Sequence, residues 1–150
     1  MELAHLLTPE TTRAHARVSS KKTCLELVAK IASDSLGVSD SELFKALFER
    51  ERLGSTGLGN GIAIPHCRIS NCQNIIGVLL TVETPIDFDA PDNLPVDVVC
   101  ALIAPREATS AHLQALAAIA ERFNDEKFVD QLRQTSSTTQ LYEFVNGSLS

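Results

Sequence analysis

Between Arg50 and His66 the sequence is Arg-Glu-Arg-Leu-Gly-Ser-Thr-Gly-Leu-Gly-Asn-Gly-Ile-Ala-Ile-Pro-His. Four glycines fall within eight residues of this segment, at Gly54, Gly57, Gly59 and Gly61. Glycine lacks a Cβ, so the backbone can turn tightly there and its amide groups can converge on an anion. Pro65 fixes its own φ angle and keeps Ile64 extended, which stiffens the approach to His66. The segment predicts a histidine at the end of a strand, beside an anion-tolerant glycine loop.

The residues before this segment follow a helical period. Ser20 is a predicted N-cap, and the helix that follows it should end at Gly37. Ser39-Asp40-Ser41-Glu42 is a predicted capping box for a second helix, which should end at Gly54. The weak alternation from Arg13 to Val18 predicts an edge strand. The apolar faces expected on the two helices comprise Cys24, Leu27, Val28 and Ile31, and then Leu43, Phe44, Leu47 and Phe48.

After His66 the pattern becomes extended and then helical again. The near-continuous apolar runs Ile75–Glu83 and Val96–Ala104 predict strands that are covered on both faces. Residues 109–123 predict an amphipathic helix, and two short helices are expected at about 125–134 and 138–145. The expected buried side of the 109–123 helix comprises Leu113, Leu116, Ala117 and Ala120.

These elements predict an α/β fold. Helices before, between and after the strands favour a mixed central β-sheet of about five strands, flanked by helices. The chain has 150 residues and no repeat or linker, so we expect a single domain over residues 1–150, with its core at about 3–145.

Composition excludes several classes of protein. The net charge of −6 and the lack of basic clusters argue against nucleic-acid binding. No apolar run approaches the roughly 20 residues of a membrane span, and the N-terminus lacks the order of a signal peptide. A cytoplasmic protein is expected, in which the four cysteines stay reduced.

The glycine loop fits neither common nucleotide motif. A P-loop ends in Gly-Lys-Ser/Thr after a strand, whereas this loop ends at Gly61-Ile62 and follows a predicted helix. A dinucleotide fingerprint needs the order strand, glycines, helix, which is reversed here. A connection without function stays open for the glycines alone.

Three residues suggest phosphoryl chemistry. His66 would be largely neutral at pH 7 and able to attack phosphorus. His112 falls in the first turn of the 109–123 helix, where the helix dipole favours an anion. Arg50 could stabilise an anionic product by charge-assisted hydrogen bonds. Spacing alone fits equally a His112 that borders the apolar stripe and a solvated Arg50, and it does not show that the three residues meet.

The segment from Arg50 to His66 closely resembles the active-site signature of phosphotransferase-system IIA domains of the fructose/mannitol type. Three later segments resemble the same family in the same order: Glu83–Phe88, Pro95–Asp97 and Ala111–Leu113. The family fold is a mixed sheet with helices on both faces.

The resemblance implies roles for individual residues. His66 would be phosphorylated, as tele-phosphohistidine, by an HPr-like phosphocarrier that a phosphoenolpyruvate-dependent Enzyme I charges. His112 and Arg50 would orient and neutralise the phosphoryl group, and no cofactor or metal is implied. Support of the phosphate is assigned to the loop residues Ser55, Thr56, Gly57, Gly59 and Gly61.

Two further segments, Leu6–Glu10 and Ser20–Lys22, resemble the nitrogen-regulatory branch of the family. That branch implies a nitrogen-branch phosphocarrier and a regulatory output, with targets such as potassium-transport or sensor-kinase systems. Cys67 departs from the small residue that often follows the histidine, and it leaves a thiol beside the site.

Three alternatives stay open. A sugar-specific IIA component would use the same residues and pass the phosphoryl group to a IIB domain. A metal-binding or redox module would use His66, Cys67, Cys72 and His112, although their spacings do not match the usual zinc motifs. An interaction module without chemistry would leave His66 unreactive.

Overall fold

A computed structural model describes residues 3–147 of the chain. Its elements are two 3₁₀ helices, six strands and five α-helices within those residues. In chain order they are η1 Leu3–Leu6, η2 Pro9–Thr11, β1 Thr12–Ala16, α1 Lys21–Leu36, α2 Asp40–Leu53, β2 Gly57–Gly59, β3 Ile62–Ala63, β4 His66–Ile69, β5 Ile76–Ile86, β6 Val96–Pro105, α3 Thr109–Phe123, α4 Glu126–Arg133 and α5 Thr138–Val145.

The strands form one mixed sheet in the order β1-β5-β6-β3-β2, with β4 also paired to β6. Strands β5 and β6 are antiparallel, β1 runs parallel to β5, and both β3 and β4 run parallel to β6. The mixed sheet expected from the sequence is therefore confirmed, with six strands rather than about five. The predicted edge strand is β1, and the two long apolar runs are β5 and β6.

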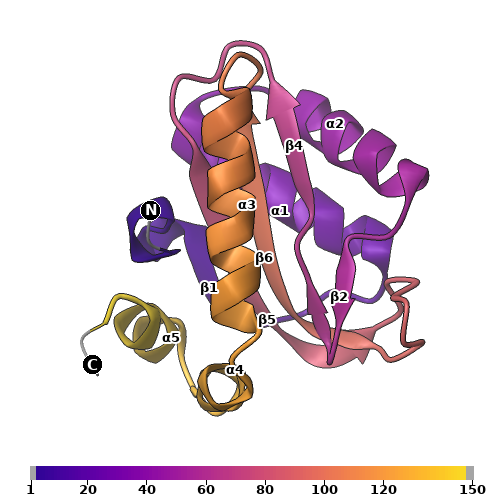
Figure 1. Ribbon diagram of the computed structural model, residues 1–150, viewed down its shortest axis with the longest axis vertical. Coiled ribbons are helices and arrows are strands. Elements are labelled where there is room, and N and C mark those ends of the chain that lie inside the picture. The colour runs from indigo at the N-terminus through magenta and orange to yellow at the C-terminus, as the bar shows by residue number, and fades with distance from the viewer. Residues whose placement is uncertain (1–2, 148–150) are drawn as a thin grey trace.

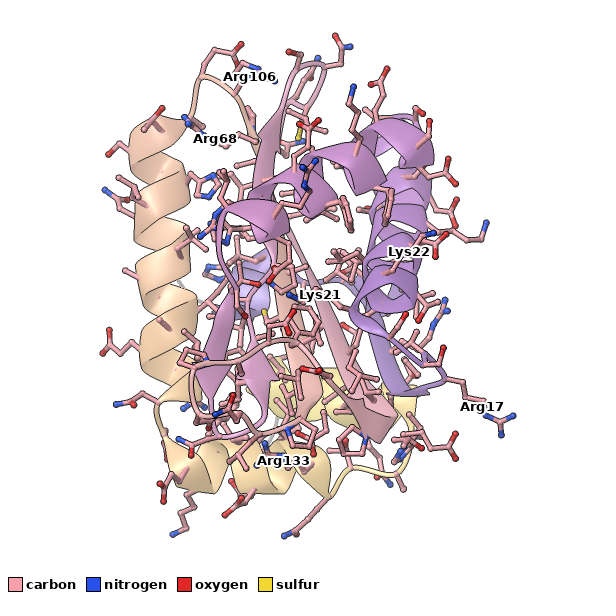
Figure 2. The ribbon with its side chains drawn as sticks, turned by 90° about the vertical axis from the view of Figure 1, so that its right-hand side faces the viewer. Arg17, Lys21, Lys22, Arg68, Arg106 and Arg133 are labelled. Atoms are coloured by element: carbon pink, nitrogen blue, oxygen red, sulfur yellow. The ribbon has the colours of Figure 1, made fainter. Side chains whose placement is uncertain are left out.

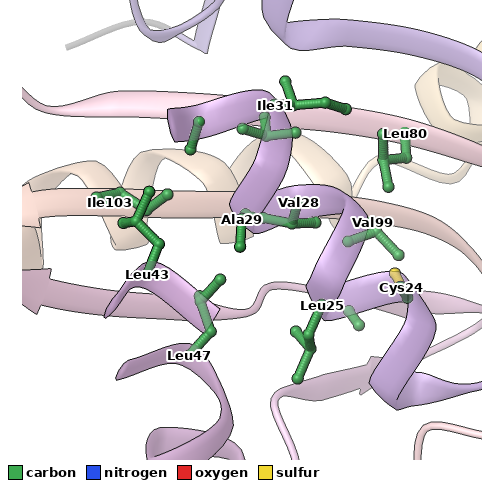
Figure 3. Packing of buried hydrophobic residues seen from close by; sticks show 14 of the residues in the cluster. Cys24, Leu25, Val28, Ala29, Ile31, Leu43, Leu47, Leu80, Val99 and Ile103 are labelled. Carbon is green, nitrogen blue, oxygen red and sulfur yellow. The ribbon is translucent and has the colours of Figure 1, made fainter. Parts of the chain in front are cut away.

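Helices cover both faces of this sheet (Figure 1), as expected. Helices α1 and α2 pack on one face through a cluster that includes Leu25, Leu47 and Val99 (Figure 3). Helices α3, α4 and α5 belong to a second cluster on the other face, which includes Leu102, Ile119 and Leu132. The two long strands contribute to both clusters, which explains why their sequences are apolar without alternation.

Local signals place the ends of α1 and α2 where they were predicted. The Ser20 hydroxyl accepts the Thr23 N–H at 3.1 Å, and Gly37 takes the left-handed conformation with φ 72°. Ser39 caps α2 through the Glu42 N–H, and Gly54 follows its last residue. On the predicted α2 stripe only Leu43 and Leu47 are buried, and Phe48 is 37% exposed.

Helix α3 has the predicted bounds, but the predicted buried side was only partly right, since Leu116 and Ala120 pack half-buried against the second cluster while Leu113 and Ala117 are exposed. Its buried residues are His112, Ala115, Ile119 and Phe123, while Leu113 is 63% exposed. Both sets of residues have helical spacing, and the sheet selects between them by contact. This rotation turns His112 towards the sheet and leaves Leu113 facing outward.

The position of His66 also differs from the prediction. His66 opens β4 instead of following the end of a strand, and the register Ala63–Val99 continues as His66–Leu102. Strands β3 and β4 are thus one line along β6, interrupted at Ile64 and Pro65, whose carbonyl accepts the Leu102 N–H. The interruption occurs because proline has no N–H for the ladder.

No helix within residues 3–147 is long and apolar enough to cross a membrane.

Candidate active site

A cavity of about 640 Å³ opens where β4 lies between the C-terminal half of α2 and the first turns of α3. Strand β4 lies between these helices in Figure 1 as well. His66, His112 and Arg50 all face this cavity, so the tertiary structure brings the three candidates together. The lining residues are Ala46, Glu49, Arg50, Leu53, His66, Cys67, Arg68, Arg106, Thr109, His112, Leu113 and Leu116.

The hydrogen bonds of His66 favour one tautomer of its ring. Its Nδ1 atom lies 2.9 Å from the Ile64 carbonyl oxygen, which can only accept a hydrogen bond. The proton is therefore assigned to Nδ1, and Nε2 keeps its lone pair. Burial is the main cause that lowers the His66 pKa, and the Arg50 charge lowers it further. Contacts with Ile64 and Glu51 act in the opposite direction. At pH 7 the half-buried ring is therefore neutral, with an unprotonated Nε2.

Arg50 lies in the last turn of α2, as expected, and reaches Nε2 of His66. Its Nε–H donates to His66 Nε2 at 3.3 Å, and its Nη1–H donates to the Gly54 carbonyl at 3.0 Å. The guanidinium is thus held beside the lone pair where a new bond would form. Several of its N–H groups could donate to the oxygens of an incoming phosphoryl group.

His112 lies in the first turn of α3, and its ring and that of His66 meet edge to face. The two ring centroids are 5.6 Å apart, and the ring planes are 78° apart. His112 is 6% exposed, and its Nδ1 has no hydrogen-bond partner among the described residues. Burial lowers the pKa of His112, and the charges of His66 and Arg68 lower it further. A second neutral imidazole therefore stands next to the first.

Two arginines that were not predicted from the sequence, Arg68 and Arg106, line the same cavity. Arg68 Nη1 donates to the Thr109 hydroxyl at 2.7 Å, and Arg106 Nε donates to Ser70 at 3.3 Å. The two side chains lie together at one end of the molecule, and Arg133 lies at the other (Figure 2). Arg68 could have been found from the sequence, because residues two apart on a strand share a face. Arg106 gave no such signal.

The predicted phosphate-supporting residues lie elsewhere. None of Ser55, Thr56, Gly57, Gly59 and Gly61 lines the cavity around His66. Strands β2 and β3 form a hairpin whose turn is Asn60-Gly61, with φ angles of 57° and 82°. The Thr56 N–H binds Glu51, and the Gly57 N–H binds the Ser55 hydroxyl. Their role in binding phosphate stays a prediction, while the structure assigns them to the fold.

The cysteines are buried. Burial raises the pKa of Cys67, which follows His66, to about 12, so its thiol stays protonated at neutral pH. Cys72 is buried in the same apolar cluster. Within residues 3–147, no three His, Cys, Asp or Glu side chains gather as a metal ion would require.

Comparison with known proteins identifies the family. The family model "Phosphoenolpyruvate-dependent sugar phosphotransferase system, EIIA 2" matches residues 5–148 of the chain. The chain belongs to this family. The EIIA resemblance found in the sequence is therefore confirmed, and with it a function in the phosphotransferase system.

The relatives of this EIIA chain include nitrogen-regulatory proteins. The Nitrogen regulatory protein of Klebsiella oxytoca is 41% identical over 97% of this chain and 90% of its own length. The crystal structure of Nitrogen Regulatory Protein IIA-Ntr from Neisseria meningitidis superposes with a TM-score of 0.86 at 32% identity. That match covers 95% of this chain and 97% of the other.

A sugar-branch structure shares the fold. The crystal structure of IIA mannitol from Escherichia coli superposes with a TM-score of 0.77 at 19% identity. The match covers 93% of this chain and 98% of the other. At this identity the likeness shows the architecture alone. What distinguishes the branches must therefore be tested by chemistry and binding.

Proposed function

We propose that this EIIA chain carries a phosphoryl group on Nε2 of His66. The main support is a pair of contacts on the His66 ring: Nδ1 lies against the Ile64 carbonyl, and Nε2 accepts a hydrogen bond from Arg50. The Nε2 lone pair attacks the phosphorus of a phosphohistidine on an HPr-like carrier. The P–N bond to the carrier breaks as the bond to Nε2 forms, and the carrier imidazole leaves with the electron pair.

The surrounding groups would stabilise the charges that this step creates. The His66 ring gains positive character on phosphorylation, and the Nδ1–H bond to the Ile64 carbonyl becomes stronger with it. Arg50 moves its N–H groups from the lone pair to the phosphoryl oxygens, and His112 donates a ring N–H to the same group.

The proposal includes a regulatory output, supported by the nitrogen-regulatory names of the relatives. A nitrogen-branch phosphocarrier would supply the phosphoryl group, from phosphoenolpyruvate through Enzyme I. The phosphorylation state of His66 would then control binding to targets such as potassium-transport or sensor-kinase systems in the cytoplasm.

The test is intact-protein mass spectrometry after incubation with phosphoenolpyruvate, Enzyme I and an HPr-like carrier. We expect one added phosphoryl group that is labile in acid, stable in base and absent from His66→Ala. His5→Ala is the matched control, because His5 is exposed and far in sequence from the site. A folded wild-type protein that gains no mass with carriers of either the nitrogen or the sugar branch would contradict the proposal.

A further inference from the structure

Glu51 is a buried charge that the proposed phosphoryl transfer does not use. Its side chain is 2% exposed, although a carboxylate away from water is costly unless it is fully paired. The pairing is provided by Thr56, whose N–H and hydroxyl both donate to the carboxylate. The ammonium group of Lys21 completes it at 3.1 Å.

These contacts join four parts of the fold at one point. Lys21 is the first residue of α1, Glu51 lies in the last turn of α2, and Thr56 precedes β2. Lys21 also pairs with Asp89 at 3.1 Å and lies over the ring of Phe88 in the β5–β6 connection. Figure 2 shows Lys21 among the packed elements, whereas Arg17 projects outward.

The same short segment also holds the site arginine. Arg50 precedes Glu51, and its guanidinium donates to the Gly54 carbonyl, two residues before Thr56. The Ser55 hydroxyl between them donates to the Phe88 carbonyl at 2.7 Å. The backbone from Gly54 to Thr56 is therefore fixed by Glu51 on one side and provides the acceptor for Arg50 on the other. An arginine without such an acceptor would sample many rotamers.

We propose that Glu51, with Thr56 and Lys21, is a positioning cluster that holds Arg50 against Nε2 of His66. The inference rests on the proposed phosphoryl transfer but can be tested without it. Glu51 acts through the carbonyl of Gly54 and the turn that carries it. If the Glu51 contacts were purely structural, weakening them would lower the stability of the protein but would leave the placement of Arg50 unchanged.

The decisive variant is Thr56→Val, because it removes one hydrogen bond to Glu51 and keeps every charge. We expect kcat for phosphoryl acceptance to fall about tenfold, with KM for the carrier unchanged, because Arg50 acts on the bound phosphoryl group. Thr56→Ser keeps the hydroxyl and should restore the wild-type kcat. Thr56→Ala removes the same hydroxyl, keeps every charge and serves as the second variant if Thr56→Val fails to fold. Glu51→Gln should lower kcat in the same way, and it is compared by kcat alone because the Glu51 charge itself raises the His66 pKa.

The matched control is Asp97→Asn. Asp97 pairs with Arg133 at 2.9 Å, and Arg133 also binds the Asn60 carbonyl at the turn of the β2–β3 hairpin. Neither residue lines the cavity around His66. This variant should lose stability but keep the wild-type kcat. Stability of all variants is compared by urea unfolding, so that a loss of fold is separated from a loss of placement.

The His66 pKa, followed by NMR of the imidazole signals, gives a readout independent of transfer. The charge of Arg50 lowers the His66 pKa and the charge of Glu51 raises it, while His112 is the titratable group whose ring lies next to His66. If Thr56→Val releases Arg50, this pKa should rise, and Thr56→Ser should reverse the change. An unchanged pKa in the folded variant overturns the positioning role, whatever happens to kcat.

The two proposals fail in different ways. A wild-type chain that accepts no phosphoryl group would remove the proposed function while the pKa comparison still tested the cluster. A raised pKa with an unchanged kcat would overturn the claim that the cluster serves the transfer. Equal losses of kcat in Thr56→Val and Asp97→Asn would reduce the cluster to a contribution to stability.

Discussion

The hairpin from Gly57 to Ala63 and the cavity around His66 are neighbours in sequence, but they differ in how completely their polar groups are hydrogen-bonded. In the hairpin, Arg133 binds both Asp97 and the Asn60 carbonyl, and the Asn60 N–H binds Asp92. At the cavity, the Nδ1 of His112 is buried without a hydrogen-bond partner among the described residues. Paired groups stabilise a turn, whereas an unpaired ring nitrogen in a cavity lined by Arg50, Arg68 and Arg106 could receive a hydrogen bond from, or donate one to, an anionic ligand. The glycines therefore form a turn outside the cavity, and the polar groups that could bind an anion lie around His66.

The largest effect expected within this comparison is at Arg50. Arg50→Ala should slow phosphoryl acceptance by about 10- to 100-fold, which corresponds to the roughly 1.5–3 kcal/mol of hydrogen bonds to a charged group. Arg50→Lys should recover only part of this rate, since a point charge does not replace the planar fork. Rapid-quench kinetics would measure both. An unchanged rate in Arg50→Ala would make Arg50 a solvated charge at a helix end.

The next effect concerns the turn of the hairpin. Gly61 has φ 82°, and an added Cβ would lie 2.8 Å from Asp97 and close to Arg133. Gly61→Ala should therefore lower the free energy of unfolding by about 1–3 kcal/mol. Urea unfolding would measure this loss. The transfer rate of the folded variant should be retained; a large fall in rate would return Gly61 to the predicted phosphate support.

A smaller effect is expected at His112. His112→Ala should slow transfer about tenfold, equal to about 1.4 kcal/mol, and keep His66 as the site of phosphorylation. Peptide mapping under basic conditions would locate the phosphoryl group, and stopped-time mass spectrometry would give the rate. A rate equal to that of the wild type would leave His112 with only its packing role on α3.

The smallest effect is the dependence of stability on pH. Burial lowers the pKa of both His66 and His112 in the folded state. The unfolded chain, with ordinary values near 6.5, then binds more protons than the folded chain as the pH falls. Their contribution to stability should be complete above about pH 6.5 and decline as the pH falls from there through the folded pKa values.

Urea unfolding between pH 8 and pH 5 would measure this decline. The matched control is the double variant His66→Ala/His112→Ala, which should show a shallower dependence over the same range. Equal slopes in the two proteins would mean that the histidines titrate in the folded state as they do in the unfolded chain.

Local signals in the sequence carried much of the fold. The caps at Ser20 and Ser39 and the stops at Gly37 and Gly54 were found because they depend on residues within a few positions of one another. The buried side of α3 was predicted only in part, because Leu113 and Ala115 both fit a helical stripe and only the sheet distinguishes them. Arg106 was missed for a similar reason, since a loop arginine has no periodic pattern.

By itself, the sequence determined the kind of elements, their approximate ends, the family and the three residues worth testing, because periodicity, caps and a long motif are local properties. The tertiary structure decided that His66, Arg50 and His112 share one cavity, and that the glycines form a hairpin outside it. It also decided that Arg68 lines the same cavity and that the buried carboxylate of Glu51 accepts hydrogen bonds from Thr56. These facts depend on contacts between segments far apart in the chain, and such contacts arise only when the helices pack on the sheet.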